Sequence, residues 1–343
     1  MRGALFLGDR KLEIRDFPEE EPGPGEVLLK MRASGMCGSD LHKYRSPASE
    51  IASPNNRPGH EPCGEVAAVG PGVTRLRVGD RVINHHYLGC GHCRFCRQGY
   101  SQLCLNPGPD TRYYGGTAHG GHGDYMVCHE RTCVPLPDEL SFEAGAMVAC
   151  GTSTAWLALD KLEVSGRDVL AIFGQGPVGL AATMLGAEMG ARVIAIDLSD
   201  ERLALAREAG AWETVNASDG GAVDRVRELT HGDGADATLE AVGAGPTRQQ
   251  AAQAARVFGR CALVGERGQA VYDATPDIIH RHLTLYGSWT VSTFGMEETA
   301  RFIVDRDVPI DSLITNRVGI DDAVEAYDFF DKQTSGKMVI TWE

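Results

Sequence analysis

Four cysteines stand close together in one short segment, and their spacing predicts a metal site. Cys90, Cys93, Cys96 and Cys104 follow the pattern C-x2-C-x2-C-x7-C. Four thiolates at this range complete the tetrahedral shell of Zn²⁺ and leave no open coordination position, which is typical of structural zinc. An iron–sulfur cluster is disfavoured, because ferredoxin-like runs place the fourth cysteine after three residues. We therefore expect a closed zinc site that shapes a lobe and does no chemistry.

Three other segments, far apart in the chain, each offer one possible metal ligand: Cys37, His60 and Cys150. Two cysteines and one histidine could hold a zinc ion with a free fourth position, as catalytic zinc sites do. Spacing alone does not show such a site, since a lone buried cysteine usually acts as a small hydrophobic residue. The histidines of the glycine-rich segment 115–123, His119 and His122, have no ligand spacing and are expected to be loop histidines.

A glycine-rich turn indicates a dinucleotide site. Gly174, Gly176 and Gly179 form the pattern GxGxxG, which follows a β-rich run over 169–173 and opens a helix-like stretch. The glycines allow a tight turn and close approach of a pyrophosphate, and the helix N-terminus attracts the phosphates. The loop residues expected to bind the cofactor are Gly174, Gly176, Pro177, Val178 and Gly179.

An acidic residue at the end of the next strand indicates which dinucleotide binds. Asp197 lies 23 residues after Gly174, and an acid about 20 residues on is expected to accept from the adenosine ribose. A carboxylate there repels a 2′-phosphate, which favours NAD over NADP. Arg202 is also a candidate cofactor-binding residue, and because an arginine can hold the extra phosphate it leaves NADP open.

The composition is that of a globular protein with more than one domain. The chain has 343 residues, of which 43% are hydrophobic and 23% charged, and its formal net charge is -14. This acidity argues against nucleic acid or an anionic membrane as a partner. The first residues lack the long apolar stretch typical of a signal peptide, and no run of about 18 apolar residues occurs, so we expect neither export nor a membrane span. The ten cysteines are therefore expected in a reducing, cytoplasmic compartment.

The elements that must position these residues change in character along the chain. Up to about residue 140, short apolar runs cut by glycine and proline predict an irregular, mostly β domain. Beyond residue 150, six β-rich runs alternate with helix-like runs, one of them over 246–259 and the last strand within 282–289. This alternation favours an α/β fold, a doubly wound parallel sheet of the Rossmann type covered on both faces. From about Val291 the mixed pattern returns.

Several motifs together resemble one known family. They are the four-cysteine loop and the segments CGSDLH, GHEPCGEVAAVG, GDRV, CGTSTAW and GQGPVG. From end to end the chain resembles a zinc-containing alcohol dehydrogenase of the medium-chain dehydrogenase/reductase family. The resemblance implies a GroES-like catalytic domain with two zinc sites over 1–151 and 291–343. It also implies an NAD-binding Rossmann domain over 152–290.

The resemblance also implies roles for individual residues around a catalytic zinc. The ligands would be Cys37, His60 and Cys150, with Glu61 as a possible fourth. Asp40 resembles the carboxylate that orients the ligand histidine. Ser39 and His42 resemble a relay that carries the substrate proton to solvent.

Three further residues follow from the same resemblance. His86 and Arg45 would line the substrate pocket, and two polar residues there favour a hydroxylated or charged substrate. Lys337 resembles a basic residue beside the cofactor pyrophosphate. An interface through the last strand of the parallel sheet would make a homodimer or homotetramer.

Together these features predict a zinc-dependent oxidoreductase with two Zn²⁺ per chain, one catalytic and one structural. It would transfer a hydride between a secondary or polar alcohol, or the corresponding ketone, and NAD. One alternative is an NADPH-dependent aldehyde or ketone reductase with the same zinc. A more remote alternative is a non-catalytic nucleotide-binding relative, although such a protein should have lost metal ligands and none is missing here.

Overall fold

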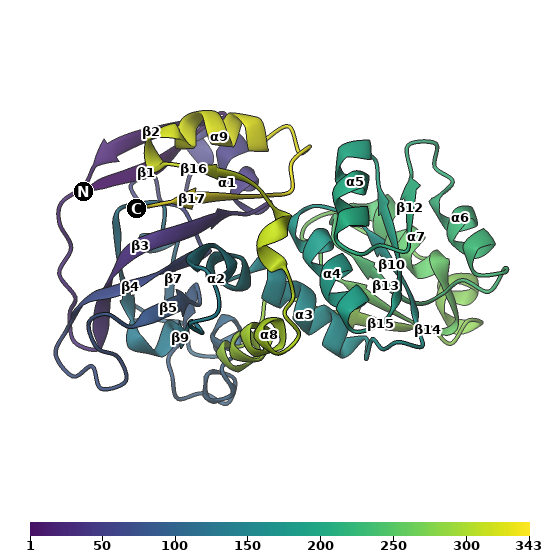
Figure 1. The fold of residues 1–343 in the computed structure, drawn as a ribbon, viewed down its shortest axis with the longest axis horizontal. Helices are drawn as coiled ribbons and strands as arrows, with labels where there is room; N and C mark the ends of the chain where they lie inside the picture. Colours follow the sequence, from purple (N-terminus) through teal and green to yellow (C-terminus); the bar gives the residue numbers. More distant parts are fainter. The chain divides into compact units, whose positions relative to one another are not determined.

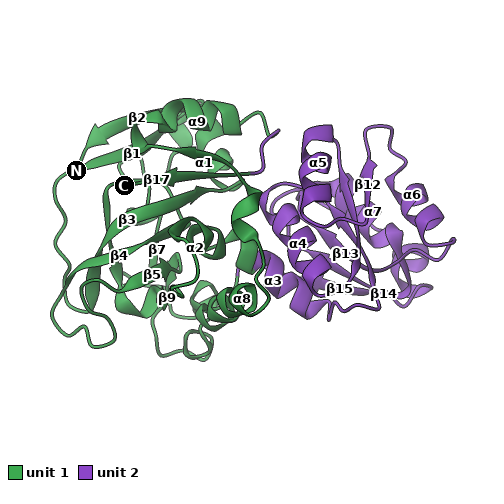
Figure 2. Ribbon diagram, viewed as in Figure 1, with its two compact units in different colours: residues 1–153, 291–333, 337–343 green, residues 154–290, 334–336 purple.

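The computed structural model describes all 343 residues, and these divide into two compact units (Figure 2). Unit 1 comprises residues 1–153, 291–333 and 337–343, and unit 2 comprises residues 154–290 and 334–336. The first boundary lies two residues beyond the one expected from the sequence. No helix of the chain is both long enough and apolar enough to span a bilayer.

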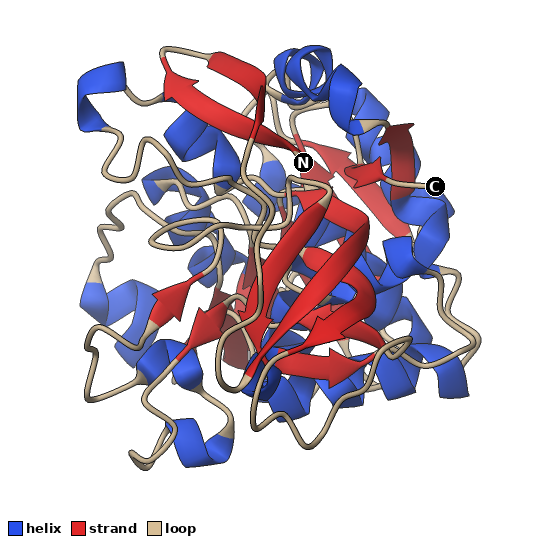
Figure 3. Ribbon diagram, turned by 90° about the vertical axis from the view of Figure 1, so that its left-hand side faces the viewer, coloured by secondary structure: helices blue, strands red, loops and turns tan.

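A seven-stranded sheet forms the framework of unit 1 (Figures 1 and 3). Its strand order is β16-β17-β3-β4-β5-β9, and β8 also pairs with β3. These strands are β3 (Glu26–Met36), β4 (Pro62–Val69), β5 (Arg81–Asn84), β8 (Tyr125–His129), β9 (Cys133–Pro135), β16 (Ile314–Val318) and β17 (Lys337–Thr341). The C-terminal strand β17 runs antiparallel to β3, so the end of the chain completes the sheet that begins near its start.

Two small sheets and several helices complete unit 1. The small sheets pair β1 (Arg2–Gly8) with β2 (Lys11–Asp16), and β6 (Tyr87–Leu88) with β7 (Arg112–Tyr113). The helices are α1 (Asp40–Arg45), α2 (Phe142–Val148), α8 (Thr293–Asp305) and α9 (Ala323–Phe330). One buried cluster, which includes Phe6, Tyr44 and Tyr327, joins β1, α1 and α9. Short 3-10 turns occur at 48–50, 96–98, 101–103, 130–132, 310–313 and 320–322.

A six-stranded parallel sheet forms unit 2, which confirms the predicted doubly wound sheet. Its strand order is β12-β11-β10-β13-β14-β15. The strands are β10 (Val169–Phe173), β11 (Arg192–Asp197), β12 (Glu213–Asn216), β13 (Ala235–Glu240), β14 (Ala255–Leu263) and β15 (Thr284–Gly287). The helices are α3 (Gly151–Lys161), which starts in unit 1, α4 (Pro177–Glu188), α5 (Asp200–Glu208), α6 (Ala222–Leu229), α7 (Gly245–Ala254) and a π-helical turn over Ala274–Ile279.

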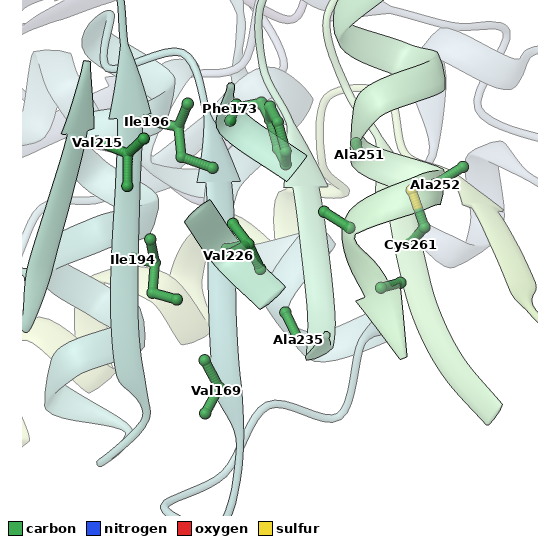
Figure 4. Packing of buried hydrophobic residues seen from close by; sticks show 14 of the residues in the cluster. Val169, Phe173, Ile194, Ile196, Val215, Val226, Ala235, Ala251, Ala252 and Cys261 are labelled. Atoms are coloured by element: carbon green, nitrogen blue, oxygen red, sulfur yellow. The ribbon is translucent and has the colours of Figure 1, made fainter. Parts of the chain in front are cut away.

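The core of unit 2 explains why these strands read as continuous apolar runs. Every residue of β10 is buried, because helices cover both faces of a parallel sheet. Val169 and Phe173 lie in a cluster with Val226 of α6 and Ala251 of α7 (Figure 4). Small residues at the helix surfaces let the helices approach the sheet closely.

One predicted element ends earlier than its pattern suggests. The helical pattern runs over 246–259, but α7 ends at Ala254 and β14 begins at the next residue. Phe258 has a left-handed backbone (φ 58°), which a helix does not accommodate. The N–H of Phe258 donates to the carbonyl of Arg281 instead (2.8 Å). Pairing with the chain that leads to β15 therefore overrides the local helical pattern.

Candidate metal and cofactor sites

Four possible ligands from three distant segments of unit 1 converge in one cluster. Cys37 follows β3, His60 and Glu61 precede β4, and Cys150 follows α2. One ligand atom from each of these residues lies within 4.8 Å of every other. Cys37, His60 and Glu61 are buried, and Cys150 is half-buried. Folding thus brings together the ligands that the family resemblance implies.

Asp40 fixes the orientation of the histidine in this cluster. Its Oδ1 lies 3.0 Å from His60 Nδ1, and its Oδ2 accepts from the N–H of Cys37 (3.0 Å). The other ring nitrogen, Nε2, is then the metal-facing atom, in the carboxylate–histidine arrangement common around zinc. Burial by itself lowers the pKa of His60, but the charges of Asp40 and Cys37 outweigh it and raise that pKa well above its ordinary value.

Glu61 presents one free oxygen to the cluster. Its Oε2 is in contact with the ammonium of Lys337, whereas its Oε1 is buried and has no hydrogen-bond partner. Burial raises the pKa of Glu61 to about 7, although the charge of Lys337 acts in the opposite direction. An unpartnered buried oxygen beside two thiols and an imidazole is the feature expected of a carboxylate that can approach a cation.

Lys337 lies at the start of β17 with a different partner from the one expected. It is buried, and its Nζ also donates to the carbonyl of Met36 (3.0 Å). Its ammonium therefore belongs to the hydrogen bonding of the metal-ligand cluster. Its role at the cofactor pyrophosphate stays a prediction.

The donor set fits a zinc ion. A hydrogen bond between the two thiols lowers the pKa of Cys37 well below its ordinary value and raises that of Cys150 well above it. Two thiols this close to each other and to an imidazole form a set that gives up protons to a cation. Two sulfurs and one imidazole match the three protein ligands of a catalytic zinc, with the fourth position left to Glu61 or to another oxygen.

Ser39 and His42 lie on the side of the cluster formed by helix α1. Ser39 Oγ is 3.3 Å from His60 Nε2, the nitrogen that would bind the metal. His42 is half-buried and lies three residues further on, within α1. The serine hydroxyl thus reaches the cluster, and His42 lies one helical turn along α1 from the serine.

A group of aromatic rings adjoins the cluster and includes the predicted pocket residue His86. The ring of His86 lies 5.1 Å from that of His60 and 4.6 Å from that of Tyr87, between centroids. Tyr87 stacks on Tyr113 (4.9 Å). The ammonium of Lys43 lies 5.3 Å from the Tyr113 ring centroid. Sequence reasoning missed Tyr87, Tyr113 and Lys43, because nothing in their spacing connects them with the ligands.

His86 is itself an unusual buried group. Burial lowers its pKa well below the ordinary value, and its Nδ1 is buried with no hydrogen-bond partner. Arg45, the other predicted pocket residue, is held elsewhere: its Nε donates to Asp331 Oδ1 (2.5 Å) and its Nη2 to the Asp331 carbonyl (3.1 Å). A place for Arg45 in the substrate pocket stays a prediction.

The four cysteines of the loop form a second cluster in unit 1. The sulfurs of Cys90, Cys93, Cys96 and Cys104 all lie within 4.8 Å of one another, and none is in a disulfide. Backbone N–H groups point at the sulfurs: Cys90 N donates to Cys104 Sγ (3.3 Å) and Cys93 N to Cys90 Sγ (3.4 Å). Donors aimed at sulfur suit thiolates that share a cation, so the loop fits a closed zinc site.

The glycine loop of unit 2 has the backbone that a dinucleotide requires. Gly174 has φ 92°, in the left-handed region that glycine adopts readily. A Cβ on Gly179 would overlap the carbonyl oxygen of Gly174, so helix and strand pack there without room for a side chain. A Cβ on Gly176 would meet nothing nearer than the guanidinium of Arg202, at 4.0 Å. Pro177 then starts α4, with Val178 in its first turn.

Asp197 is bound to this loop. Its Oδ2 accepts from Gln175 N (2.6 Å), and its Oδ1 accepts from Leu198 N (2.7 Å) and Ser199 N (3.0 Å). A carboxylate can accept about four hydrogen bonds, so one position remains for a ribose hydroxyl. Arg202 lies on the next helix, and its Nε donates to the carbonyl of Ser335 (3.3 Å).

Comparison with known proteins gives the family. Residues 23–138 match the model of the alcohol dehydrogenase GroES-like domain, and residues 177–305 match that of the zinc-binding dehydrogenases. The chain is 36% identical to the uncharacterized zinc-type alcohol dehydrogenase-like protein YphC of Escherichia coli (strain K12), over 100% of this chain and 99% of that one. It is 31% identical to the L-threonine 3-dehydrogenase of Rhizobium rhizogenes, over 96% and 95% of the two chains.

A solved structure extends the likeness to the whole fold. The alcohol dehydrogenase TADH from Thermus sp. ATN1 superposes with a TM-score of 0.89 at 27% identity, covering 99% of each chain. Both family models, the full-length relatives and this fold agree with the two ligand clusters and the glycine loop. The chain therefore belongs to the zinc-containing alcohol dehydrogenases of the medium-chain dehydrogenase/reductase family.

Proposed function

We propose that this protein oxidises a secondary or polar alcohol with NAD as the hydride acceptor, and catalyses the reverse reduction of the ketone. The observation that carries this proposal is the convergence of Cys37, His60 and Cys150, with the unpartnered Oε1 of Glu61 beside them. A ligand set of this kind leaves one position for a substrate oxygen. A closed, purely structural site would offer a fourth strong ligand instead.

Some residues of the site would bind the metal, and others hold those ligands in orientation. A zinc ion bound there would supply a Lewis acid that lowers the pKa of the substrate hydroxyl. Asp40 holds the ring of His60 so that Nε2 faces the metal, and Lys337 holds one oxygen of Glu61. Glu61 can then give way when substrate and water exchange.

The proton released from the alcohol needs a path out of a buried site. Ser39 Oγ lies beside the metal-facing nitrogen of His60, so it can accept a proton at short range. His42, one helical turn on and half-buried, can deliver that proton to solvent. Replacing His42 by Gln should lower the oxidation rate most at low pH and be partly rescued by added imidazole buffer. A rate equal to wild type across the pH range would exclude the relay.

We infer NAD as the cofactor from the environment of Asp197. Its carboxylate lies against the glycine loop and keeps one acceptor position, so it would bind ribose hydroxyls and repel a 2′-phosphate. Arg202, close to Gly176, is the feature that favours the NADPH-dependent alternative. Initial rates with NAD⁺ and NADP⁺ separate the two. Replacing Asp197 by Ser should reduce the preference for NAD⁺, whereas a wild-type preference for NADP⁺ would contradict this role for Asp197.

The surroundings of His86 support a polar substrate. An apolar alcohol would leave Nδ1 of His86 without a partner, whereas a second hydroxyl or an amine could donate to it. We therefore expect a panel of polyols, amino alcohols, hydroxy acids and simple secondary alcohols to favour the polar members. Replacing His86 by Phe should raise KM for the best polar substrate more than for a simple secondary alcohol. Equal effects on both would show that His86 does not contact the substrate.

We also expect the protein to form a homodimer or homotetramer through the edge of the parallel sheet. Strand β15 is the last strand of that sheet, so its outer edge has unpaired backbone groups. Phe258 lies next to this edge with 65% of its surface exposed, stacked on His282 (4.7 Å). Light scattering should give a mass of two or four chains, and replacing Phe258 by Asp should reduce it. A monomeric wild-type protein would contradict the expectation.

A further inference from the structure

A chain of buried hydrogen bonds leads away from the metal-facing histidine through unit 1. Asp40, which orients His60, accepts at Oδ2 from the hydroxyl of Tyr327 (3.3 Å). The Tyr327 hydroxyl lies 2.7 Å from His122 Nε2, and His122 Nδ1 lies 2.8 Å from Ser34 Oγ. All five side chains are buried. The sequence indicates no role for Tyr327, and His122 reads as an ordinary loop histidine.

The chemistry of the groups sets one direction for the whole chain. Asp40 is a carboxylate and can only accept, so the single proton of the Tyr327 hydroxyl is directed to it. Tyr327 oxygen must therefore accept from His122 Nε2–H, and His122 Nδ1 accepts from the hydroxyl of Ser34. This requires a neutral imidazole, and burial lowers the pKa of His122 to about 4. Each hydrogen bond of the chain then has a fixed donor and acceptor, and the chain ends at the carboxylate of Asp40.

Backbone contacts hold His122 next to the segment that carries the ligand. His122 N donates to the Pro58 carbonyl (3.0 Å), and Gly121 N donates to the Gly59 carbonyl (2.7 Å). Gly59 has φ 93°, and a Cβ there would overlap the ring of His122. Gly59 thus lets the ring of His122 pack on the backbone directly before His60.

Aromatic packing holds the other member of the chain. Tyr327 belongs to α9, far from the ligands in sequence, and its ring packs edge-on against Phe6 (4.9 Å) and lies 5.6 Å from the ring of Tyr44. These contacts surround the apolar ring of Tyr327, and the hydroxyl at its end points at Asp40 and His122. Helix α9 is therefore connected to the ligand His60 through the phenol of Tyr327 and the carboxylate of Asp40.

We propose that Tyr327 and His122 are positioning residues for the catalytic metal, because together they hold the carboxylate of Asp40 and, through it, the ring of His60. Two donors, Cys37 N and Tyr327, fix Oδ2 of Asp40, which leaves Oδ1 for His60. Without the phenol, the carboxylate can rotate and the imidazole loses its fixed direction. The inference rests on the proposed function only in requiring that a metal binds at Cys37, His60 and Cys150.

The test measures metal retention with the zinc-loaded, full-length enzyme. Replacing Tyr327 by Phe removes one oxygen and keeps the ring, and a coloured chelator then reports the release of the two zinc ions. We expect zinc at the Cys37 site to be held several-fold more weakly, a smaller loss than the roughly 10- to 100-fold that is usual when a direct partner of a ligand is removed. Zinc in the four-cysteine loop is the internal reference and should be released at the wild-type rate.

Tyr44 provides a matched control within the same buried cluster. Its hydroxyl donates to Asp328 (3.0 Å), so replacing Tyr44 by Phe removes a phenol oxygen that does not touch Asp40. This variant should release both zinc ions as the wild type does. If it weakens the Cys37 site as much as the change at Tyr327, the effect is general loosening of the cluster and the proposal is wrong.

A triple variant separates positioning from stability. Replacing Tyr327 by Phe leaves a buried N–H of His122 unpaired, which lowers the melting temperature in its own right. Adding His122→Leu and Ser34→Ala removes that unpaired group together with the Ser34 hydroxyl that would lose its acceptor, so the melting temperature should recover while zinc at the Cys37 site stays weakly held. Recovery of zinc retention together with the melting temperature would show a purely structural role and overturn the proposal.

The outcomes distinguish this inference from the proposed function. Wild-type retention of zinc in the Tyr327→Phe variant overturns the positioning role and leaves the proposed function intact. A wild-type enzyme whose only zinc lies in the four-cysteine loop overturns the proposed function first, and the positioning role with it.

Discussion

The two ligand clusters of unit 1 are built in opposite ways. The four-cysteine cluster takes all its ligands from residues 90–104, one loop with two 3-10 turns. The Cys37 cluster takes its ligands from segments around residues 37, 60 and 150, which only the folded sheet brings together. One site is local in the sequence and the other depends on the whole unit.

The two clusters also differ in what surrounds the ligands. Backbone N–H groups of the loop itself point at the sulfurs of the four-cysteine cluster, and of its four cysteines only Cys93 is buried. Around the Cys37 cluster the partners are buried side chains from other elements, such as Asp40, Tyr327 and Lys337. In a closed site, four protein ligands at suitable spacing fix the geometry around the metal. In an open site only three protein ligands bind the metal, so outer partners are needed to hold those ligands in orientation.

The two carboxylates beside the Cys37 cluster also differ from each other. In the Cys37 cluster, burial raises the pKa of Glu61 to about 7, and the charge and hydrogen bond of His60 keep the pKa of Asp40 low against the effect of burial. The two carboxylates differ because Asp40 has partners at both of its oxygens, whereas only one oxygen of Glu61 is held, by Lys337, and the other has no partner. Asp40 can therefore hold the ring of His60 in place, and the free oxygen of Glu61 can bind a cation or release it.

The largest effect is expected from removing a ligand of the open site. Replacing Cys37 by Ser should lower kcat below roughly one thousandth of wild type, because the metal supplies several kcal/mol of transition-state stabilisation. Zinc content should fall from two to one per chain. Binding of NADH, measured by fluorescence titration, should persist because the glycine loop lies in unit 2.

Cys63 is the control for this change. It is also buried in unit 1 and lies three residues from His60, but it belongs to neither cluster. Replacing Cys63 by Ala should keep both zinc ions and most of the activity. Substantial turnover in the Cys37→Ser variant would show that the ligand set is wrong.

A smaller effect is expected from removing an outer partner of the open site. Replacing Asp40 by Ala should weaken zinc binding at this site by about 10- to 100-fold, since His60 loses the acceptor that orients it. Competition with a chelator measures this. Asp331, which pairs with Arg45 and Arg10 away from the cluster, is the control carboxylate, and its replacement by Ala should leave zinc binding unchanged.

Breaking the closed site should affect the lobe more than the chemistry. Replacing Cys93 by Ser should remove one zinc and make residues 89–104 susceptible to limited proteolysis, because the loop has little apolar core of its own. The remaining activity should stay within about tenfold of wild type at low temperature. A loss as large as that of the Cys37→Ser variant would remove the distinction between the two sites.

The smallest effect is expected from a residue that only covers the closed site. Arg131 lies over Gly91 and its Nη2 donates to the carbonyl of Gly89 at 3.4 Å, a long hydrogen bond on an exposed side chain. Replacing Arg131 by Ala should shift the melting temperature by about 2 °C or less. A large shift with loss of zinc would show that the loop, like the open site, depends on partners outside it.

Local patterns were sufficient wherever the chain makes contacts with its own neighbours in sequence. The alternation of buried runs with helical runs predicted the parallel sheet, since a strand covered on both faces must be apolar throughout. The glycine loop and the four-cysteine loop are equally local, and both adopt the form that their spacing requires. The early end of α7 is the exception, because Phe258 pairs with Arg281 of a later segment.

The open site shows the limit of such reasoning. The resemblance to a family supplied Cys37, His60 and Cys150, but no pattern predicted that Lys337 would bind Glu61 or that Arg45 would bind Asp331.

What the sequence determined by itself was therefore the fold of unit 2, the four-cysteine cluster and the types of residue available for a second cluster. Only the tertiary structure decided which buried polar groups pair across the unit, as Tyr327 and His122 do with Asp40. The physical reason is that a buried polar atom must find a partner, and in a mixed sheet that partner can come from any part of the chain.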